Sequence, residues 1–383
     1  MSNEQGGLRQ PWLGIMGFIV VLFITFGIIT WFKVETFIPW AGELSMCCIP
    51  FMIIVGMVWA GNYPPPAATL EQPLKGVYLL FLTMIVGALV AGYSIKTVGA
   101  YVTPPTPPLI FFTIMSVIMT FWCVVVFGCW PAAGIKGNHP AFVGFGTLII
   151  SYALAFVLWK LCFNFDFMKG APFYNAVMPP SGAFFAFSSL AFFLTCLAVI
   201  LAWVEFDFWP LSLIPPKAPA FAKQPIWGIS VSIVVCIVAY IIKTIFVDNM
   251  GMDVFIYTLK VPICIIFGEF IMLIILQTWP VQTVKQPLKG IVLIVCNIIL
   301  ALVMYQFYKF CMVLIAGMLP GGPVPPPNTY VQELWIATAL LGFTFPVIAA
   351  YTGFFNYWPL TEPKPGPVVV GNAQKDPGES KAV

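Results

Sequence analysis

Charged residues are scarce in this chain. Of its 383 residues, only 8% are Asp, Glu, Lys or Arg, whereas an ordinary soluble domain has about 25%. Hydrophobic residues make up 61%, and the mean hydropathy is +0.98. This balance excludes a soluble globular protein and a disordered one, and a net charge of +3 provides no basic surface for nucleic acid. The remaining class is a polytopic membrane protein.

Metal-binding and catalytic motifs are also missing. The only histidine is His139, so haem and histidine-based copper, zinc or iron sites are disfavoured. The ten cysteines form no C-x-x-C pair and fall almost entirely in hydrophobic runs, where cysteine behaves as a small apolar residue. No nucleotide-binding loop, nucleophile elbow or zinc-protease motif occurs. We therefore expect no cofactor and no metal, and the sequence argues against an enzyme.

Long apolar stretches are abundant. A membrane helix needs about 20 consecutive, mostly apolar residues. An even number of such stretches places both termini on one side, and a ten-to-seven excess of Lys and Arg there favours cytoplasmic termini. We expect an all-α protein in a cell membrane, taken as the bacterial inner membrane. The ten predicted helices are 12–32, 41–61, 75–95, 109–130, 141–162, 182–204, 226–246, 258–279, 289–310 and 332–355.

A pair of start and stop signals recurs along the chain. Odd-numbered helices begin with Gln-Pro and a nearby glycine, with His139-Pro140 as a degenerate version, and even-numbered helices end at Trp-Pro or Tyr-Pro. The pattern predicts a two-helix hairpin used five times, with all hairpins parallel and arranged as a pseudo-fivefold ring or arc. The predicted repeats are 10–64, 72–131, 139–210, 224–280 and 286–359, in one transmembrane domain (1–366) followed by a polar, disordered tail (367–383).

Prolines, 35 in all, also cluster in three connections within the predicted hairpins. Such stiff, extended segments have few backbone donors. We favour the interpretation that they cap the hairpins, with a lid over a mouth as the alternative. The clusters are 103–108, 177–180 and 321–327.

Glu269 is the main candidate for function. It is expected near the middle of its helix, where an ionised carboxylate costs about 2.5–3.5 kcal/mol on insertion scales. It could carry a proton, or it could be structural glue bonded to a neighbouring helix. Glu43 and Glu333 are expected in the first turns of their helices, where the helix dipole favours a negative charge. Asn297 is expected to bond between helices or to line a path.

Two further sets of polar residues lie near the predicted helix ends. Glu205 and Asp207 precede Trp209 and are expected to be solvated at the membrane interface. Each predicted repeat also carries one lysine late in its first helix or just after it. These five lysines either mark helix ends by snorkelling or form a ring at one mouth that attracts anions. They are Lys33, Lys96, Lys160, Lys243 and Lys309.

Taken together, these features favour a transporter or channel for a small solute, either anionic or proton-coupled. The alternative is a cofactor-free structural subunit of a larger membrane complex, and an enzyme acting on a lipid or quinone ranks last. The expected partners are membrane lipids, with other membrane subunits or a homo-oligomer as further candidates, and no nucleic acid.

Overall fold

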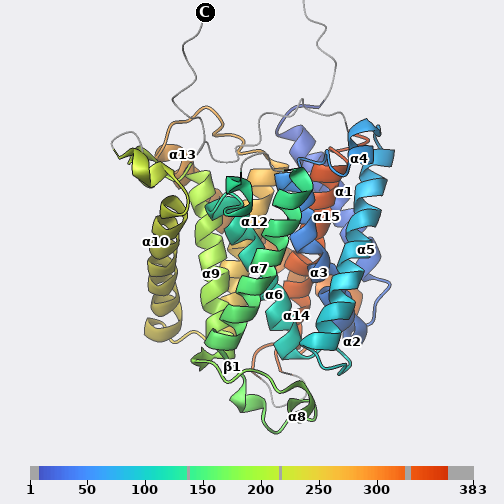
Figure 1. Cartoon of the computed structure of the whole chain (residues 1–383). Coiled ribbons are helices and arrows are strands. Elements are labelled where there is room, and N and C mark those ends of the chain that lie inside the picture. The colour runs from blue at the N-terminus through green and yellow to red at the C-terminus, as the bar shows by residue number, and fades with distance from the viewer. Residues whose placement is uncertain (1–7, 136–138, 215–217, 324–328, 361–383) are drawn as a thin grey trace, which may run out of the picture.

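The computed structural model of the chain describes residues 8–135, 139–214, 218–323 and 329–360. Ten helices in these residues are long and apolar enough to cross a membrane, and each overlaps one predicted range (Figure 1). The strands described are two-residue segments, β1 (Phe163–Asn164) and β2 (Phe184–Phe185), which pair in one loop. The all-α, membrane-integral class is thereby confirmed. The predicted tail 367–383 and part of the proline cluster 321–327 lie outside the described residues.

Five helices, called here the outer helices, are mostly exposed. Between 17% and 33% of the residues in their most hydrophobic windows are buried. Each buries one narrow stripe rich in small residues, which lets helices approach closely in a membrane. The outer helices are α1 (Trp12–Ile29), α5 (Leu74–Thr97), α7 (Pro140–Cys162), α10 with its π-helical end (Ile226–Asn249) and α13 (Leu288–Ala316).

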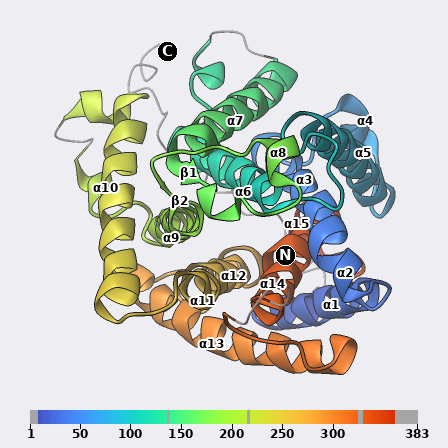
Figure 2. The same ribbon diagram turned by 90° about the horizontal axis from the view of Figure 1, so that it is seen from below.

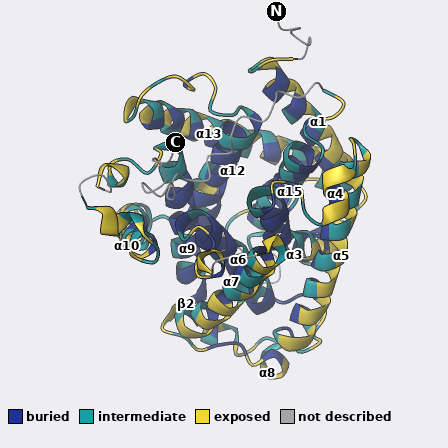
Figure 3. Ribbon diagram, turned by 45° about the horizontal axis from the view of Figure 1, so that its top comes forward, coloured by how far each residue is buried: buried dark blue, intermediate teal, exposed yellow. Residues whose placement is uncertain are grey.

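The other five, called the inner spans, are mostly buried. Between 61% and 78% of their windows are inside the protein, and Figure 3 shows the contrast with the outer helices. The inner spans are Val34–Val58 (α2 and α3), Pro107–Val126 (α6), α9 (Ala186–Glu205), Val254–Ile275 (α11 and α12) and Val331–Phe354 (α14 and α15). The α-helical parts of the compound spans are Val34–Thr36 (α2), Gly42–Ile53 (α3), Pro107–Phe121 (α6), Val254–Thr258 (α11), Cys264–Phe270 (α12), Val331–Ala337 (α14) and Phe345–Ala349 (α15).

The two sets form concentric rings. Seen from below, α1, α13, α10, α7 and α5 surround the inner spans in that order (Figure 2). The middle of the inner bundle is packed by aromatic rings. Phe270 lies 4.0 Å from Phe345 and 5.7 Å from Phe121, measured between ring centroids. Because α6 and α12 are not neighbours in the inner ring, the Phe121–Phe270 contact crosses the centre of the bundle (Figure 2).

The end of each inner span packs against a glycine of an outer helix. A Cβ atom added at any of these glycines would lie within 3.0 Å of the facing side chain, so a larger residue would collide with it. The facing residue is in every case the one that directly follows the inner span. The pairs are Trp59 with Gly144, Phe127 with Gly228, Phe206 with Gly290, Leu276 with Gly14, and Phe355 with Gly76.

The Gln-Pro signals supply hydrogen bonds at the same junctions. The amide of each glutamine donates to the last backbone carbonyl of an inner span, as from Gln224 to Val126 at 3.0 Å and from Gln286 to Glu205 at 2.8 Å. Gln10 and Gln72 do the same with Ile275 and Phe354. At His139 the direction is reversed, because the Trp59 indole donates to the Pro140 carbonyl at 2.8 Å. The start signals are therefore docking contacts as well as helix starts.

One predicted boundary is wrong in a way that matters for function. The helix expected at 41–61 begins at Val34, because a π-helical segment, Phe37–Ala41, accommodates Pro39 inside the span. Glu43 is consequently the tenth residue of this 25-residue span and not a first-turn residue. The helix dipole at an N-terminus therefore does not account for Glu43.

The connections at the lower end in Figure 1 include short elements and the first two proline clusters. α8 (Tyr174–Val177) lies in the loop between β1 and β2, and α6 begins within the first cluster, with Pro107 and Pro108 in its first turn. A cavity of about 400 Å³ separates residues 102–107 from Pro172, Phe173 and Ala176. Elsewhere, α4 (Pro65–Thr69) follows the first inner span, and 3-10 turns lie at Ala132–Gly134, Asp166–Met168, Leu211–Leu213 and Pro219–Ala222.

Candidate functional site

Glu269 lies on α12 and is fully buried. Its exposed fraction is 0%, and neither carboxylate oxygen has a hydrogen-bond partner among the described residues. The span begins at Val254, so Glu269 is its sixteenth residue of 22 and lies about 9 Å from the end at Ile275, nearer that end than predicted. A carboxyl group buried without any partner is costly, so this position requires a proton or a ligand.

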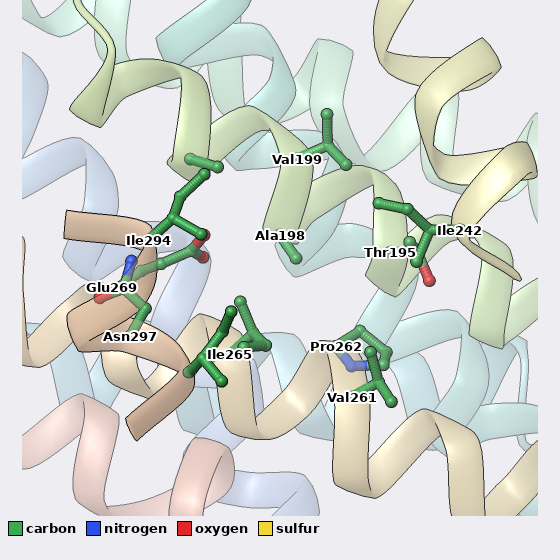
Figure 4. Close-up of a pocket in the computed structure, with 12 residues that line it drawn as sticks. Thr195, Ala198, Val199, Ile242, Val261, Pro262, Ile265, Glu269, Ile294 and Asn297 are labelled. Carbon is green, nitrogen blue, oxygen red and sulfur yellow. The ribbon is translucent and has the colours of Figure 1, made fainter. Parts of the chain in front are cut away.

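Asn297 faces Glu269 from the outer helix α13. A Cβ atom added at Gly268 would lie 2.9 Å from the Asn297 carbonyl oxygen, so the glycine allows α12 and α13 to approach closely. The Asn297 amide nitrogen donates to a Glu205 carboxylate oxygen at 2.7 Å. The Asn297 side-chain oxygen has no partner among the described residues. Figure 4 shows Asn297 and Glu269 next to each other on the two helices.

Glu205 is the third member of the site, and its predicted solvation is wrong. It is the last residue of α9 and is 0% exposed, because it faces α13 and not the interface. A negative charge at a helix C-terminus is unfavourable, and the donor from Asn297 compensates it. Asp207, two residues later, is exposed as expected and pairs with Lys289 at 3.1 Å. No local sequence signal distinguishes Glu205 from Asp207, because the burial of Glu205 depends on α9 ending at that residue.

A cavity of about 180 Å³ adjoins this cluster. Four helices contribute to its walls: α9, α10, the span containing α12, and α13 (Figure 4). Most of the lining is aliphatic. Its polar members are Glu269, Asn297 and Thr195, and the Thr195 hydroxyl is already bonded to Tyr257 at 2.8 Å.

The site is rich in hydrogen-bond acceptors. Four buried oxygen atoms lack partners among the described residues: both of Glu269, one of Glu205 and one of Asn297. The Asn297 amide nitrogen donates one of its two hydrogens to Glu205, which leaves one amide N–H for these four oxygens. Such a set binds ligands that supply hydrogen-bond donors or positive charge.

The other two predicted acids lie elsewhere and have partners. Glu43 accepts a hydrogen bond from Thr113 at 2.6 Å and contacts the Cys47 thiol at 3.5 Å, leaving its second oxygen without a partner among the described residues. Glu333 is in the first turn of α14 as expected, and both its oxygens accept from the Gly322 amide at 3.1 Å. Of the predicted site residues, only Glu269 and Asn297 come together.

The five predicted lysines lie far apart along the chain. Lys33 lies between α1 and the first inner span, and the other four lie in the last third of their outer helices. Four are exposed, and Lys243 is half-buried. Lys160 lies over the Trp159 ring at 5.1 Å and over the Phe156 ring at 5.9 Å. Positions near helix ends suit snorkelling side chains. Their role as an anion-attracting ring stays a prediction.

Comparisons with protein-family models, with curated proteins and with solved structures each return no match. The function is therefore inferred from the geometry of this site.

Proposed function

We propose that this membrane-integral chain is a carrier for a small solute, and that Glu269 links movement of the solute to a proton. The main support for this proposal is the Glu269 carboxyl group, which is fully buried on the wall of a cavity and has two oxygens without partners among the described residues. A group retained in such a place despite its cost is usually functional in membrane proteins.

Protonation gives Glu269 two distinct bonding states. The protonated acid has one O–H donor, and Asn297, whose side-chain oxygen has no partner among the described residues, lies beside it on the neighbouring helix. The carboxylate has no donor and must be compensated by a ligand. If the proton and the ligand exchange at this one carboxyl group, binding of the solute is coupled to release of the proton.

The nature of the solute is narrowed by charge. The lining of the cavity contains no cationic side chain, and its polar end presents carboxyl and amide oxygens without partners among the described residues, so a neutral or positively charged solute is favoured over the anionic one considered from sequence. The packed rings of Phe121, Phe270 and Phe345 in the middle of the bundle favour a carrier over an open channel.

A cofactor-free structural subunit is the second candidate. The packed centre of the bundle and the aliphatic outer surface suit that role too. Mass measurement of the natively extracted protein discriminates between the two: stoichiometric partner subunits favour the structural role, and a monomer or homo-oligomer favours transport.

We also propose that the fold consists of five parallel hairpin repeats closed into a ring. Support comes from the five glycine contacts, which all join the end of an inner span to the start of an outer helix. In each contact, the end of the inner span of one predicted repeat packs on the outer helix two repeats later in the chain. After the fifth repeat the pattern returns to the first, so the fourth inner span contacts the first outer helix and the fifth inner span contacts the second.

Transport is tested in proteoliposomes with the purified full chain. Uptake of a panel of radiolabelled cationic, neutral and anionic solutes is measured with and without an inside-acid pH gradient. We expect the gradient to accelerate at least one solute, and Glu269→Gln to reduce that acceleration at least tenfold. Glu71→Gln, which changes an exposed acid between α4 and α5, is the matched control. Equal gradient-driven uptake by wild type and Glu269→Gln would remove Glu269 from the mechanism.

A further inference from the structure

We propose that the solute is a small amine with an apolar body, bound as its ammonium form in the cavity between α10 and α13, where it replaces the proton of Glu269. This assignment rests on the proposed function, since it names the substrate class of the same site. It follows from two separate properties of the cavity: the hydrogen-bonding character of its inner end and the chemistry of its walls.

The end of the cavity formed by Glu269 and Asn297 presents mainly hydrogen-bond acceptors. Glu269 and Asn297 line the cavity, and three of their side-chain oxygens have no partner among the described residues. An ammonium group carries three N–H donors and one positive charge. It satisfies these oxygens and compensates the Glu269 carboxylate, whereas a hydroxyl group brings only one donor and no charge.

The walls are apolar and belong partly to the outer surface. Ile242 of α10 and Ile294 of α13 lie on opposite sides of the cavity (Figure 4). Ile298, also in the lining, is 46% exposed, so the cavity reaches the face that is turned to lipid. α10 packs mainly on α9 and α13 mainly on α12, which leaves the space between these two outer helices to the cavity. An apolar amine can therefore enter from the bilayer.

Binding releases one proton per amine. In water the amine is an ammonium ion, and it leaves one proton there when it enters the bilayer as the neutral amine. In the cavity the amine takes the proton of the Glu269 carboxyl, and the product is a carboxylate–ammonium pair with no change in net charge of the site. The neutral Glu269 acid and the carboxylate–ammonium pair are thus alternative states of one site.

Equilibrium binding tests this assignment without requiring transport. Cyclohexylamine is titrated into the full chain in lipid nanodiscs, with empty nanodiscs subtracted, by calorimetry in two buffers of different ionisation enthalpy. Cyclohexanol and cyclohexanecarboxylate are the neutral and anionic comparators. We expect saturable binding of the amine at least tenfold tighter than either comparator, with release of up to one proton per amine bound. Equal affinity for the three molecules, or no proton release, would overturn the assignment.

Three variants separate the causes. Glu269→Gln should weaken amine binding at least tenfold and abolish proton release. Ile298→Trp should weaken binding by filling the lipid-facing side of the cavity, and Ile291→Trp, an exposed position of α13 outside the lining, should leave it unchanged. If the amine fails to bind while gradient-driven uptake of another solute still requires Glu269, the substrate class is wrong and the proposed function stands. If uptake of every solute is independent of Glu269, both are wrong.

Discussion

At the scale of single residues, burial and hydrogen bonding distinguish the three glutamates that the sequence offers as candidates for transport. Glu333 has both oxygens on one backbone amide, and Glu43 has a hydroxyl and a thiol. Glu269 has no partner among the described residues. Unsatisfied buried carboxylate oxygens are rare in folded proteins because they forgo their solvation, so this position is the one that most needs a functional explanation.

The Asn297–Glu205 hydrogen bond should contribute to the stability of the fold. We expect Asn297→Val to destabilise the protein by about 1–3 kcal/mol, because Glu205 is left without its donor. The change is measured as a lowered midpoint of thermal unfolding in detergent. Thr83→Val is the matched control, since Thr83 is seven residues after Gly76, as Asn297 is after Gly290, and its hydroxyl bonds only within its own helix, at 2.8 Å. Equal losses in the two variants would contradict a specific role for the bond.

Asp166, outside the membrane-spanning helices, gives a pH-dependent prediction. The hydroxyl of Ser181, followed by Lys169 and Tyr174, holds the pKa of Asp166 below its ordinary value. A depressed folded-state pKa means that the stabilisation is complete above the ordinary value of about 3.9 and is lost as the pH falls through the lowered value. We expect hydrogen-exchange protection factors in residues 163–185 to fall in that acidic range.

The same loop can be tested at neutral pH. Asp166→Asn should speed tryptic cleavage after Lys169 several-fold, because the contacts to Lys169 and Ser181 weaken together. Asp248→Asn, an exposed acid at the end of the α10 span, should not change the rate. If Asp166→Asn leaves both the cleavage rate and the hydrogen-exchange protection of residues 163–185 unchanged, the Asp166 contacts do not hold this loop.

At the scale of elements, the sequence predicts the helices well. Apolar length and proline punctuation are local properties, so the ten helix ranges and the Gln-Pro start signals could be recognised without a structure. The docking role of the glutamines could not, because their acceptors are distant in the chain. Glu205 and Glu43 could not be placed, because their environment depends on where α9 ends and on a π-helical segment that extends a helix past Pro39. Which outer helix packs on which inner span is equally beyond local signals, since it is decided by contacts between residues distant in the chain.

The glycine contacts should hold the outer helices against the inner spans. On α5, Gly76→Ala should destabilise the protein by about 1–3 kcal/mol, because the added methyl group collides with the Phe355 ring. Gly92→Ala, on the same helix, meets no atom within 4 Å and should be neutral or slightly stabilising, since alanine favours a helix more than glycine does. Thermal unfolding midpoints in detergent compare the two. Equal effects would show that the Gly76–Phe355 contact does not hold α5 in place.

At the scale of the whole molecule, the contacts between inner spans and outer helices run all the way around. The contact of Gly14 with Leu276 and the bond from Gln10 to Ile275 join the first outer helix to the fourth inner span. Tyr357 also lies against Gly17, so the last inner span ends beside α1. If the ring is closed as we propose, the chain can begin at any of the predicted repeats.

Circular permutation tests this closure. Four existing connections between a terminal Pro of one predicted repeat and the first Gln or His of the next contain five to thirteen residues. A linker in that range from Pro359 to Gln10, with new termini opened between Pro280 and Gln286, should yield a folded protein with an unfolding midpoint within a few degrees of the original. Opening the chain between α1 and α2, within a predicted repeat, is the comparison. Failure of the first permutant to fold would favour an open arc with distant ends.

Exchange of a proton for a ligand at Glu269 is measured by gradient-driven flux in proteoliposomes. With the solute that the gradient accelerates most, we expect uptake by wild type and by Glu71→Gln to depend on the inside-acid gradient. We expect uptake by Glu269→Gln to be at least tenfold slower and independent of the gradient. Gradient-dependent uptake that persists unchanged in Glu269→Gln would show that Glu269 does not couple the solute to a proton.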